Sequence, residues 1–166
     1  MALIIELPEA LAKRLREEAR KLDVGPELLA IELLAEALNP GSKDRAEACW
    51  SAAEHMLKKA EEELAKGGLR QASEKIRGAA ALAVKVLAHE REGRRPTSHG
   101  ELWGYVSDLA SETGDEELGR LWRSATSMHV NFYEGWAPGN EVRRALEDVK
   151  TLISKLRRLG QAAGGP

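Results

Sequence analysis

The chain is 166 residues long, which suffices for one ordinary domain or for a small module beside a compact one. Its hydrophobic content of 43% is too high for a disordered chain, so we expect a folded core. The formal net charge of −2 excludes a general electrostatic attraction to nucleic acids or to anionic membranes, so nucleic-acid binding would need a local basic patch.

Cysteine usage and the lack of long apolar runs indicate the compartment. Cys49 is the only cysteine, so no disulfide can form within the chain, which is typical of a reducing environment. No apolar run approaches the length of a membrane-spanning helix, and the N-terminus lacks the basic start of a signal peptide. We therefore expect a cytoplasmic protein without a membrane partner.

Residues 1–41 predict an arm built from a strand and two helices. Residues 2–7 indicate a short strand, and Pro8 suits the first turn of a helix over residues 8–22. A second helix is expected over residues 26–38, before a break that marks the domain boundary. A strand that begins a chain needs a partner, so we expect this arm to serve dimerisation or docking.

Residues 42–160 predict an all-α, antiparallel up-down helical bundle, followed by a flexible tail over residues 161–166. Residues 78–84 are small and apolar nearly all round, which is typical of a helix in the centre of a bundle. The expected helices cover about 44–66, 69–91, 116–133 and 141–159, with a further helix that Thr97 or Ser98 caps and that ends near Gly114.

The arm resembles the ribbon-helix-helix module, in which two chains pair their strands and the resulting ribbon reads DNA. The matching residues are Ile4 to Glu9, then Leu11, Leu15, Leu22, Leu28, Ile31, Leu34 and Leu38. However, the strand carries none of the Arg, Lys, Asn or Gln side chains that usually read bases. Residues 1–40 contain five basic and eight acidic residues, a net charge of −3 that opposes phosphate binding. Duplex DNA binding is therefore the least favoured function.

The segment from Trp122 to Trp136 concentrates aromatic and polar side chains in a chain that has few aromatics. Residues 44–159 resemble the archaeal PaREP-type family within the HEPN superfamily. The residues that carry the resemblance are the small-residue helix 72–85, the helix start 98–103 and the block 129–134. The resemblance implies a HEPN-like helical bundle, while membership of this archaeal group alone implies no activity.

Many HEPN proteins are ribonucleases whose signature is an arginine, four to six residues, and then a histidine. Arg123 and His129 are separated by five residues and satisfy this spacing, although Ser124 replaces the commoner Asn, Asp or His. Arginine offers a permanently charged fork for a phosphate, and histidine titrates near neutrality as an acid or a base. We therefore predict Arg123 and His129 as catalytic residues, with Ser124, Asn131, Tyr133, Glu134 and His99 binding the substrate.

The competing interpretation is structural. Arg123 could pair with Glu116 or Glu117, His129 could bond within packing, and the aromatics could be core or dimer anchors. Residues six apart are also not on one face of a regular helix, so the predicted pair needs a bend or a helix start. A symmetric dimer would bring two such pairs into one cleft.

No metal or cofactor is expected, because the four histidines (55, 89, 99 and 129) do not fall at ligand spacings with carboxylates. The first hypothesis is a homodimer that handles RNA or nucleotide phosphates, with metal-independent ribonuclease chemistry. The second is a non-catalytic helical interaction or nucleotide-binding module, such as the partner of a nucleotidyltransferase. A DNA-binding regulator is third.

Overall fold

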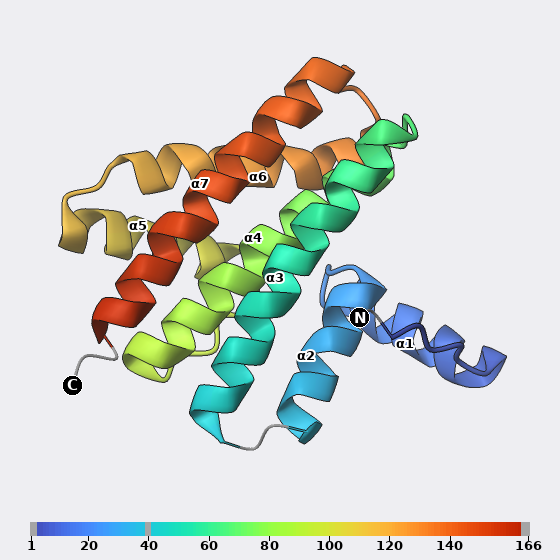
Figure 1. The fold of residues 1–166 in the computed structure, drawn as a ribbon, viewed down its shortest axis with the longest axis horizontal. Coiled ribbons are helices and arrows are strands. Elements are labelled where there is room, and N and C mark those ends of the chain that lie inside the picture. The colour runs from blue at the N-terminus through green and yellow to red at the C-terminus, as the bar shows by residue number, and fades with distance from the viewer. Residues whose placement is uncertain (1–2, 39–40, 164–166) are drawn as a thin grey trace.

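The computed structural model describes residues 3–38 and 41–163. Within these residues the chain forms seven α-helices and no β-strand (Figure 1). The helices are α1 (Glu9–Lys21), α2 (Pro26–Leu38), α3 (Ser42–Ala65), α4 (Leu69–Glu92), α5 (His99–Thr113), α6 (Glu117–Glu134) and α7 (Gly139–Ala163). The predicted all-α class is confirmed. None of the helices in the described ranges combines the length and apolarity needed to cross a membrane.

Helix α4 lies at the centre of the bundle and packs against α3, α6 and α7 (Figure 1). Its residues from Gly78 to Val84 are all buried, as their small and apolar character predicts. Small side chains let the neighbouring helices approach closely: a Cβ atom at Gly78 would collide with the Met56 methyl group. Helices α1 and α2 follow one another at one side of the bundle, and α1 projects away from it (Figure 1).

The strand predicted over residues 2–7 is wrong for the single chain. The described residues 3–7 form no strand, and the side chains of Leu3 and Ile4 are 84% and 89% exposed. A strand depends on backbone hydrogen bonds to a neighbouring strand, and the described residues of one chain offer this segment none. Residue 2 lies outside the described residues.

The end of the last helix also differs from the prediction. Helix α7 continues through Gly160 to Ala163, whereas the sequence predicted a helix that ends at residue 159 and a flexible tail over residues 161–166. A Cβ atom at Gly160 would lie 3.5 Å from Leu87 Cδ1 and 3.6 Å from Trp50 Cζ2, so the glycine packs closely against α4 and α3. This packing holds the helix beyond the expected stop. Residues 164–166 of the predicted tail lie outside the described residues.

A capping box fixes the start of α5. The Ser98 hydroxyl accepts a hydrogen bond from the Glu101 N–H group at 3.2 Å. In return, the Glu101 carboxylate accepts from the backbone N–H groups of Thr97 and Ser98 at 2.7 and 2.9 Å. These backbone hydrogen bonds lower the pKa of Glu101 to about 2. The cap is important for the site below because His99 is the first residue of α5.

Ser98→Ala should lower the free energy of unfolding by about 1 kcal/mol, the usual cost of losing a serine cap. Urea unfolding followed by circular dichroism measures this change. Ser51→Ala is the matched control, because Ser51 is exposed in the middle of α3 and should change the free energy by less than about 0.5 kcal/mol. Equal stability of the two variants would contradict the role of the cap.

Candidate functional site

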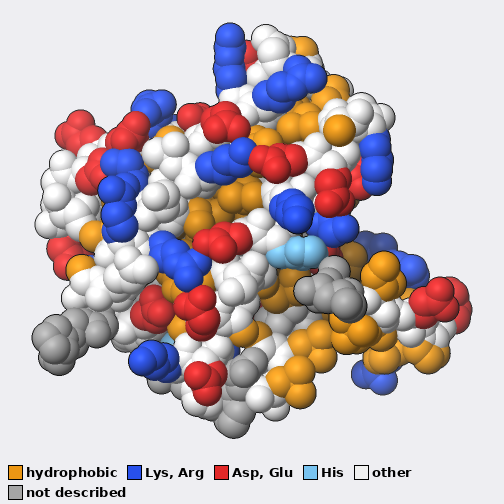
Figure 2. Space-filling view, in the orientation of Figure 1, with side chains coloured by type: hydrophobic (Ala, Val, Ile, Leu, Met, Phe, Trp, Pro, Cys, Tyr) orange, Lys and Arg blue, Asp and Glu red, His pale blue; other side chains and the backbone are white. Residues whose placement is uncertain are grey.

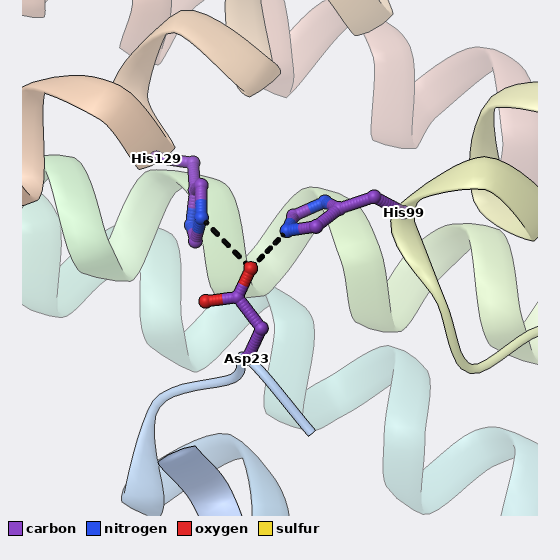
Figure 3. Close-up of side chains that lie close together, drawn as sticks. All are labelled: Asp23, His99 and His129. Carbon is purple, nitrogen blue, oxygen red and sulfur yellow. Dashed lines mark hydrogen bonds and ion pairs between the residues drawn. The ribbon is translucent and has the colours of Figure 1, made fainter. Parts of the chain in front are cut away.

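Three side chains from separate elements meet in front of α4. Asp23 comes from the turn between α1 and α2, His99 from the start of α5, and His129 from α6 (Figure 3). The Asp23 Oδ2 atom lies 2.5 Å from His99 Nε2 and 3.3 Å from His129 Nε2. The centroids of the two imidazole rings are 4.6 Å apart. One carboxylate oxygen therefore bridges two imidazoles.

The turn that carries Asp23 closes helix α1. Asp23 adopts a positive φ of 54°, a left-handed conformation that Asp tolerates better than most residues. Its N–H group donates to the Arg20 carbonyl at 3.2 Å, and the Val24 N–H group donates to the Ala19 carbonyl at 3.0 Å. These bonds satisfy the last carbonyls of α1 and direct the Asp23 side chain towards the histidines.

Arg77 supplies a buried positive charge behind the histidines. The residue is 8% exposed on α4, and its guanidinium lies 5.0 Å from the centroid of the Trp122 ring. Its Nη2 atom lies 3.2 Å from His99 Nδ1. Burial lowers the pKa of Arg77 to about 10, against the opposing effect of the Asp23 charge, so the guanidinium remains charged near neutral pH.

The contact with Arg77 fixes the tautomer of His99. A guanidinium can only donate hydrogen bonds, so the Nδ1 atom of His99 must accept. The proton of the neutral imidazole is then on Nε2, where it donates to Asp23. Arg77 therefore donates to His99, and His99 donates in turn to the Asp23 carboxylate.

The charges of this cluster shift its pKa values. Burial would raise the pKa of Asp23, but the hydrogen bond from His99 and the charges of both histidines outweigh it and lower that pKa. Burial lowers the pKa of His129 more strongly than the Asp23 charge raises it. The Tyr133 hydroxyl donates to Asp23 Oδ1 at 3.5 Å, and burial together with the Asp23 charge raises the pKa of Tyr133.

A cavity of about 370 Å³ adjoins the cluster, within the size range of small-molecule sites. Four basic side chains line the cavity: Arg16, Arg20, Lys75 and Arg77. Its acidic lining residues besides Asp23 are Glu27 and Glu74. Lys75 forms an ion pair with Glu27. His129, Phe132 and Tyr133 form the wall that α6 contributes. The cavity can therefore receive a ligand that carries negative charge.

Asp23, His99 and His129 also have the composition of a metal site, since one ligand atom from each lies within 4.8 Å of the others. A histidine that binds a metal through Nε2 needs an acceptor for the proton on its other nitrogen. At His99 that other nitrogen faces the Arg77 guanidinium, which is a donor. The buried charge of Arg77 also opposes a cation nearby. The arrangement favours an anion between the imidazoles, the position that the Asp23 carboxylate holds.

The helical bundle also matches known proteins. The family model of the archaeal PaREP1/PaREP8 family matches residues 48–153. The chain belongs to this family. It is similar to a protein from Sulfolobus solfataricus whose crystal structure is known, with 32% identity and a TM-score of 0.57, over 65% of this chain and 95% of that chain. No curated protein matches. The PaREP-type resemblance of the sequence is thus confirmed, and the cluster lies partly outside the matched segment, because Asp23 precedes it.

The structure of this PaREP family member does not bring Arg123 and His129 together within one chain. Six residues correspond to about 600° of helix rotation, which directs the two side chains to different sides of α6. Arg123 is exposed, does not line the cavity, and forms no hydrogen bond or ion pair with the residues that the structure describes. The alternative pairing of Arg123 with Glu116 or Glu117 is not formed either, since Glu117 pairs with Arg120 and Lys155. Pairing of Arg123 with a second chain stays a prediction.

The other predicted site residues separate into two groups. His99 and Tyr133 contact Asp23 and join His129 in the cluster. Ser124 and Glu134 do not line the cavity, and the side chain of Glu134 is exposed. Asn131 is fully buried and bonds to α4 and to the segment before α7, so its predicted contact with a substrate is at odds with its position.

The sequence prediction missed Asp23 and Arg77. Arg77 did give a signal, because it is the one charged residue between Ile76 and Val84, and a charge there must find a partner. Asp23 gave no signal beyond its place in a turn. Its role depends on how the arm folds against the bundle, which spacing along the chain cannot reveal.

Acid should destabilise this protein, and His129 should account for part of the loss. Because the folded pKa of His129 is lowered, the unfolded chain takes up a proton first as the pH falls. The contribution of neutral His129 to the free energy of unfolding is fully present above the ordinary histidine pKa. It is lost as the pH falls through the pKa of His129 in the folded protein. The free energy of unfolding in urea should therefore be lower at about pH 5.5 than at about pH 7.5.

His129→Gln should reduce this difference between the two pH values. It should not remove it, because burial also lowers the pKa of His89. His55→Gln is the control, since His55 is exposed on α3 and should leave the difference as it is in the unmodified protein. If His129→Gln leaves the pH dependence unchanged, then His129 takes up its proton equally in the folded and in the unfolded protein, which contradicts the prediction.

Proposed function

We propose that this PaREP family member binds a phosphate group of RNA or of a nucleotide between His99 and His129, and that it cleaves RNA there without a metal ion. The observation that carries the proposal is the meeting of two imidazoles on the Asp23 carboxylate, with the Arg77 guanidinium behind them. An oxyanion already occupies this position, and a phosphate oxygen has the same charge and the same capacity to accept hydrogen bonds.

The charge of the cavity supports a phosphate ligand. Arg16, Arg20 and Lys75 line the cavity beside the histidines, and only Lys75 is engaged in an ion pair with an acidic lining residue. The Asp23 side chain must move away when the phosphate binds, because its carboxylate occupies the position proposed for the phosphate. Its side chain is 47% exposed, so it can turn towards solvent when a ligand enters.

The proposed cleavage needs one base and one fixed positive charge. His129, neutral near pH 7 because its pKa is lowered, takes the proton of the 2′-hydroxyl. The 2′-oxygen bonds to phosphorus as the bond to the 5′-oxygen breaks, and that oxygen takes a proton from water. Arg77 and the Nε2–H group of His99 stabilise the charge on the phosphorus oxygens. The product is a 2′,3′-cyclic phosphate, and His129 returns its proton to solvent.

We extend the proposal to membership of the HEPN superfamily, to a cytoplasmic location and to a homodimer. The exposed apolar side chains of the N-terminal arm support the dimer, since patches of this kind mark interaction surfaces. Figure 2 shows hydrophobic side chains gathered over α1 and α2. They are Leu3, Ile4, Ile5, Leu7, Leu11, Leu22, Leu33, Leu34 and Leu38. A second chain would give residues 3–7 a pairing partner and could carry an exposed Arg123 to its neighbour's cleft.

The test is incubation of the purified protein with mixed RNA in EDTA, followed by analysis of the fragment ends. We expect fragments that end in 2′,3′-cyclic phosphate. Saturable nucleotide binding without cleavage would favour the second hypothesis, a non-catalytic nucleotide-binding or interaction module, such as the partner of a nucleotidyltransferase. The absence of both RNA cleavage and phosphate binding would overturn the proposal.

A further inference from the structure

A second cavity lies on another side of the arm, between α2, α3, α4 and the α4–α5 loop. Its volume is about 270 Å³. The buried side chains of Leu29, Leu82 and Val86 contribute an apolar floor, and Cys49 lines the wall from α3. Val24 is the one described residue that lines both this cavity and the one beside His129. The two cavities are therefore neighbours with different chemistry.

The charged residues around this cavity are paired, with one exception. Lys85 forms an ion pair with Glu32 at 2.9 Å, and Arg95 pairs with Glu36 at 3.1 Å. The exception is Arg45, because no carboxylate of the described residues lies within 4.0 Å of its guanidinium. The paired groups cancel one another, so the half-buried Arg45 leaves the cavity with one uncompensated positive charge.

The contact that Arg45 does make does not neutralise it. Its Nη2 atom lies 3.0 Å from His89 Nδ1 and 2.5 Å from His89 Nε2. Burial lowers the pKa of His89, and the nearby charges of Arg45 and Arg95 lower it further. His89 is therefore a neutral acceptor near pH 7, and Arg45 retains donors and charge for a further anionic group.

We propose that this cavity binds a small apolar carboxylic acid, whose hydrocarbon tail covers the floor and whose carboxylate pairs with Arg45. An apolar floor with one convergent cationic group is the usual composition of a pocket for such a ligand. At about 30 Å³ for each water-sized group, the volume holds about nine such groups. A medium-chain acid such as octanoate has this size. The inference does not depend on the proposed function of the His129 site.

The test compares octanoate with octanol by isothermal titration calorimetry. The two molecules share the tail and differ in the head group, so octanol should bind at least about ten-fold more weakly, as expected for the loss of a charge-assisted hydrogen bond. Cys49 gives an independent signal, because it is the only cysteine and it lines the cavity. Saturating octanoate should slow the alkylation of Cys49 by iodoacetamide, whereas octanol at the same concentration should protect it less.

Arg45→Met removes the charge and keeps an apolar stem, and it should also weaken octanoate binding at least about ten-fold. Arg123→Met is the matched control, because Arg123 also lacks a carboxylate partner among the described residues but does not line this cavity. The inference is overturned if octanoate does not bind saturably, if octanol binds equally well, or if Arg45→Met binds octanoate as the unmodified protein does. The comparison of the two ligands decides the matter even if Arg45→Met fails to fold.

Discussion

His129→Ala should lower the rate of RNA cleavage in EDTA by about 10²–10⁴-fold, the usual contribution of a general base. The imidazole is neutral near pH 7 because burial lowers its pKa, and its Nε2 atom lies 3.3 Å from the oxyanion position that Asp23 holds. Among the described histidines, only His99 and His129 contact the Asp23 carboxylate. Initial rates on a short RNA oligomer, with the enzyme in excess, measure the chemical step without product release.

Two control variants determine what the loss means. His55→Ala changes an exposed histidine on α3 and should leave the rate unchanged. Arg123→Ala should also leave it unchanged if the site consists of His129, His99 and Arg77 of one chain. A loss with Arg123→Ala comparable to that with His129→Ala would instead support the pair predicted from the sequence, assembled across two chains. Full activity of a folded His129→Ala variant would contradict both versions.

The helices were predictable because their causes are local. Gly67-Gly68 and Gly135 end helices in the structure, and the positive φ values of Gly67 and Gly135 show why glycine stands there. The small residues from Gly78 to Val84 predict the central position of α4 from the sequence alone. Gly160 misled the prediction, because there the same residue type permits close packing instead of a chain reversal. A single sequence does not distinguish these two uses of glycine.

The site was predictable only where its residues lie close in sequence or follow a family pattern. His129 and Tyr133 are one helical turn apart on α6, so both could be found in the same segment. Asp23, Arg77 and His99 come from three other parts of the chain, and only tertiary packing brings them together. Figure 3 shows how Asp23 and His99 meet beside His129. The sequence predicted Arg123 as the arginine of the site, whereas in the structure Arg77 is the arginine that lies beside His99. Long-range placement of this kind leaves no trace in spacing.

Asn131→Ala should lower the free energy of unfolding by about 2–4 kcal/mol, because it removes two buried hydrogen bonds. The Asn131 Nδ2 group donates to Ser73 Oγ at 2.8 Å, and its Oδ1 atom accepts from the Ala137 N–H group at 2.7 Å. Alanine would leave the buried Ala137 N–H group without an acceptor, which costs more than the loss of the bond alone. These bonds tie α6 to α4 and to the segment before α7. Urea unfolding measures the change.

Asn140→Ala is the matched control, since Asn140 is exposed at the start of α7 and should change the free energy by less than about 0.5 kcal/mol. A double-mutant cycle with Ser73→Ala separates the bond between α6 and α4 from the bond to Ala137, and we expect a coupling of about 1 kcal/mol. The opposite pattern is equally informative. If Asn131→Ala is as stable as Asn140→Ala but cannot cleave RNA, then Asn131 contacts the substrate, as the sequence predicted, and the buried position described above does not persist when RNA binds.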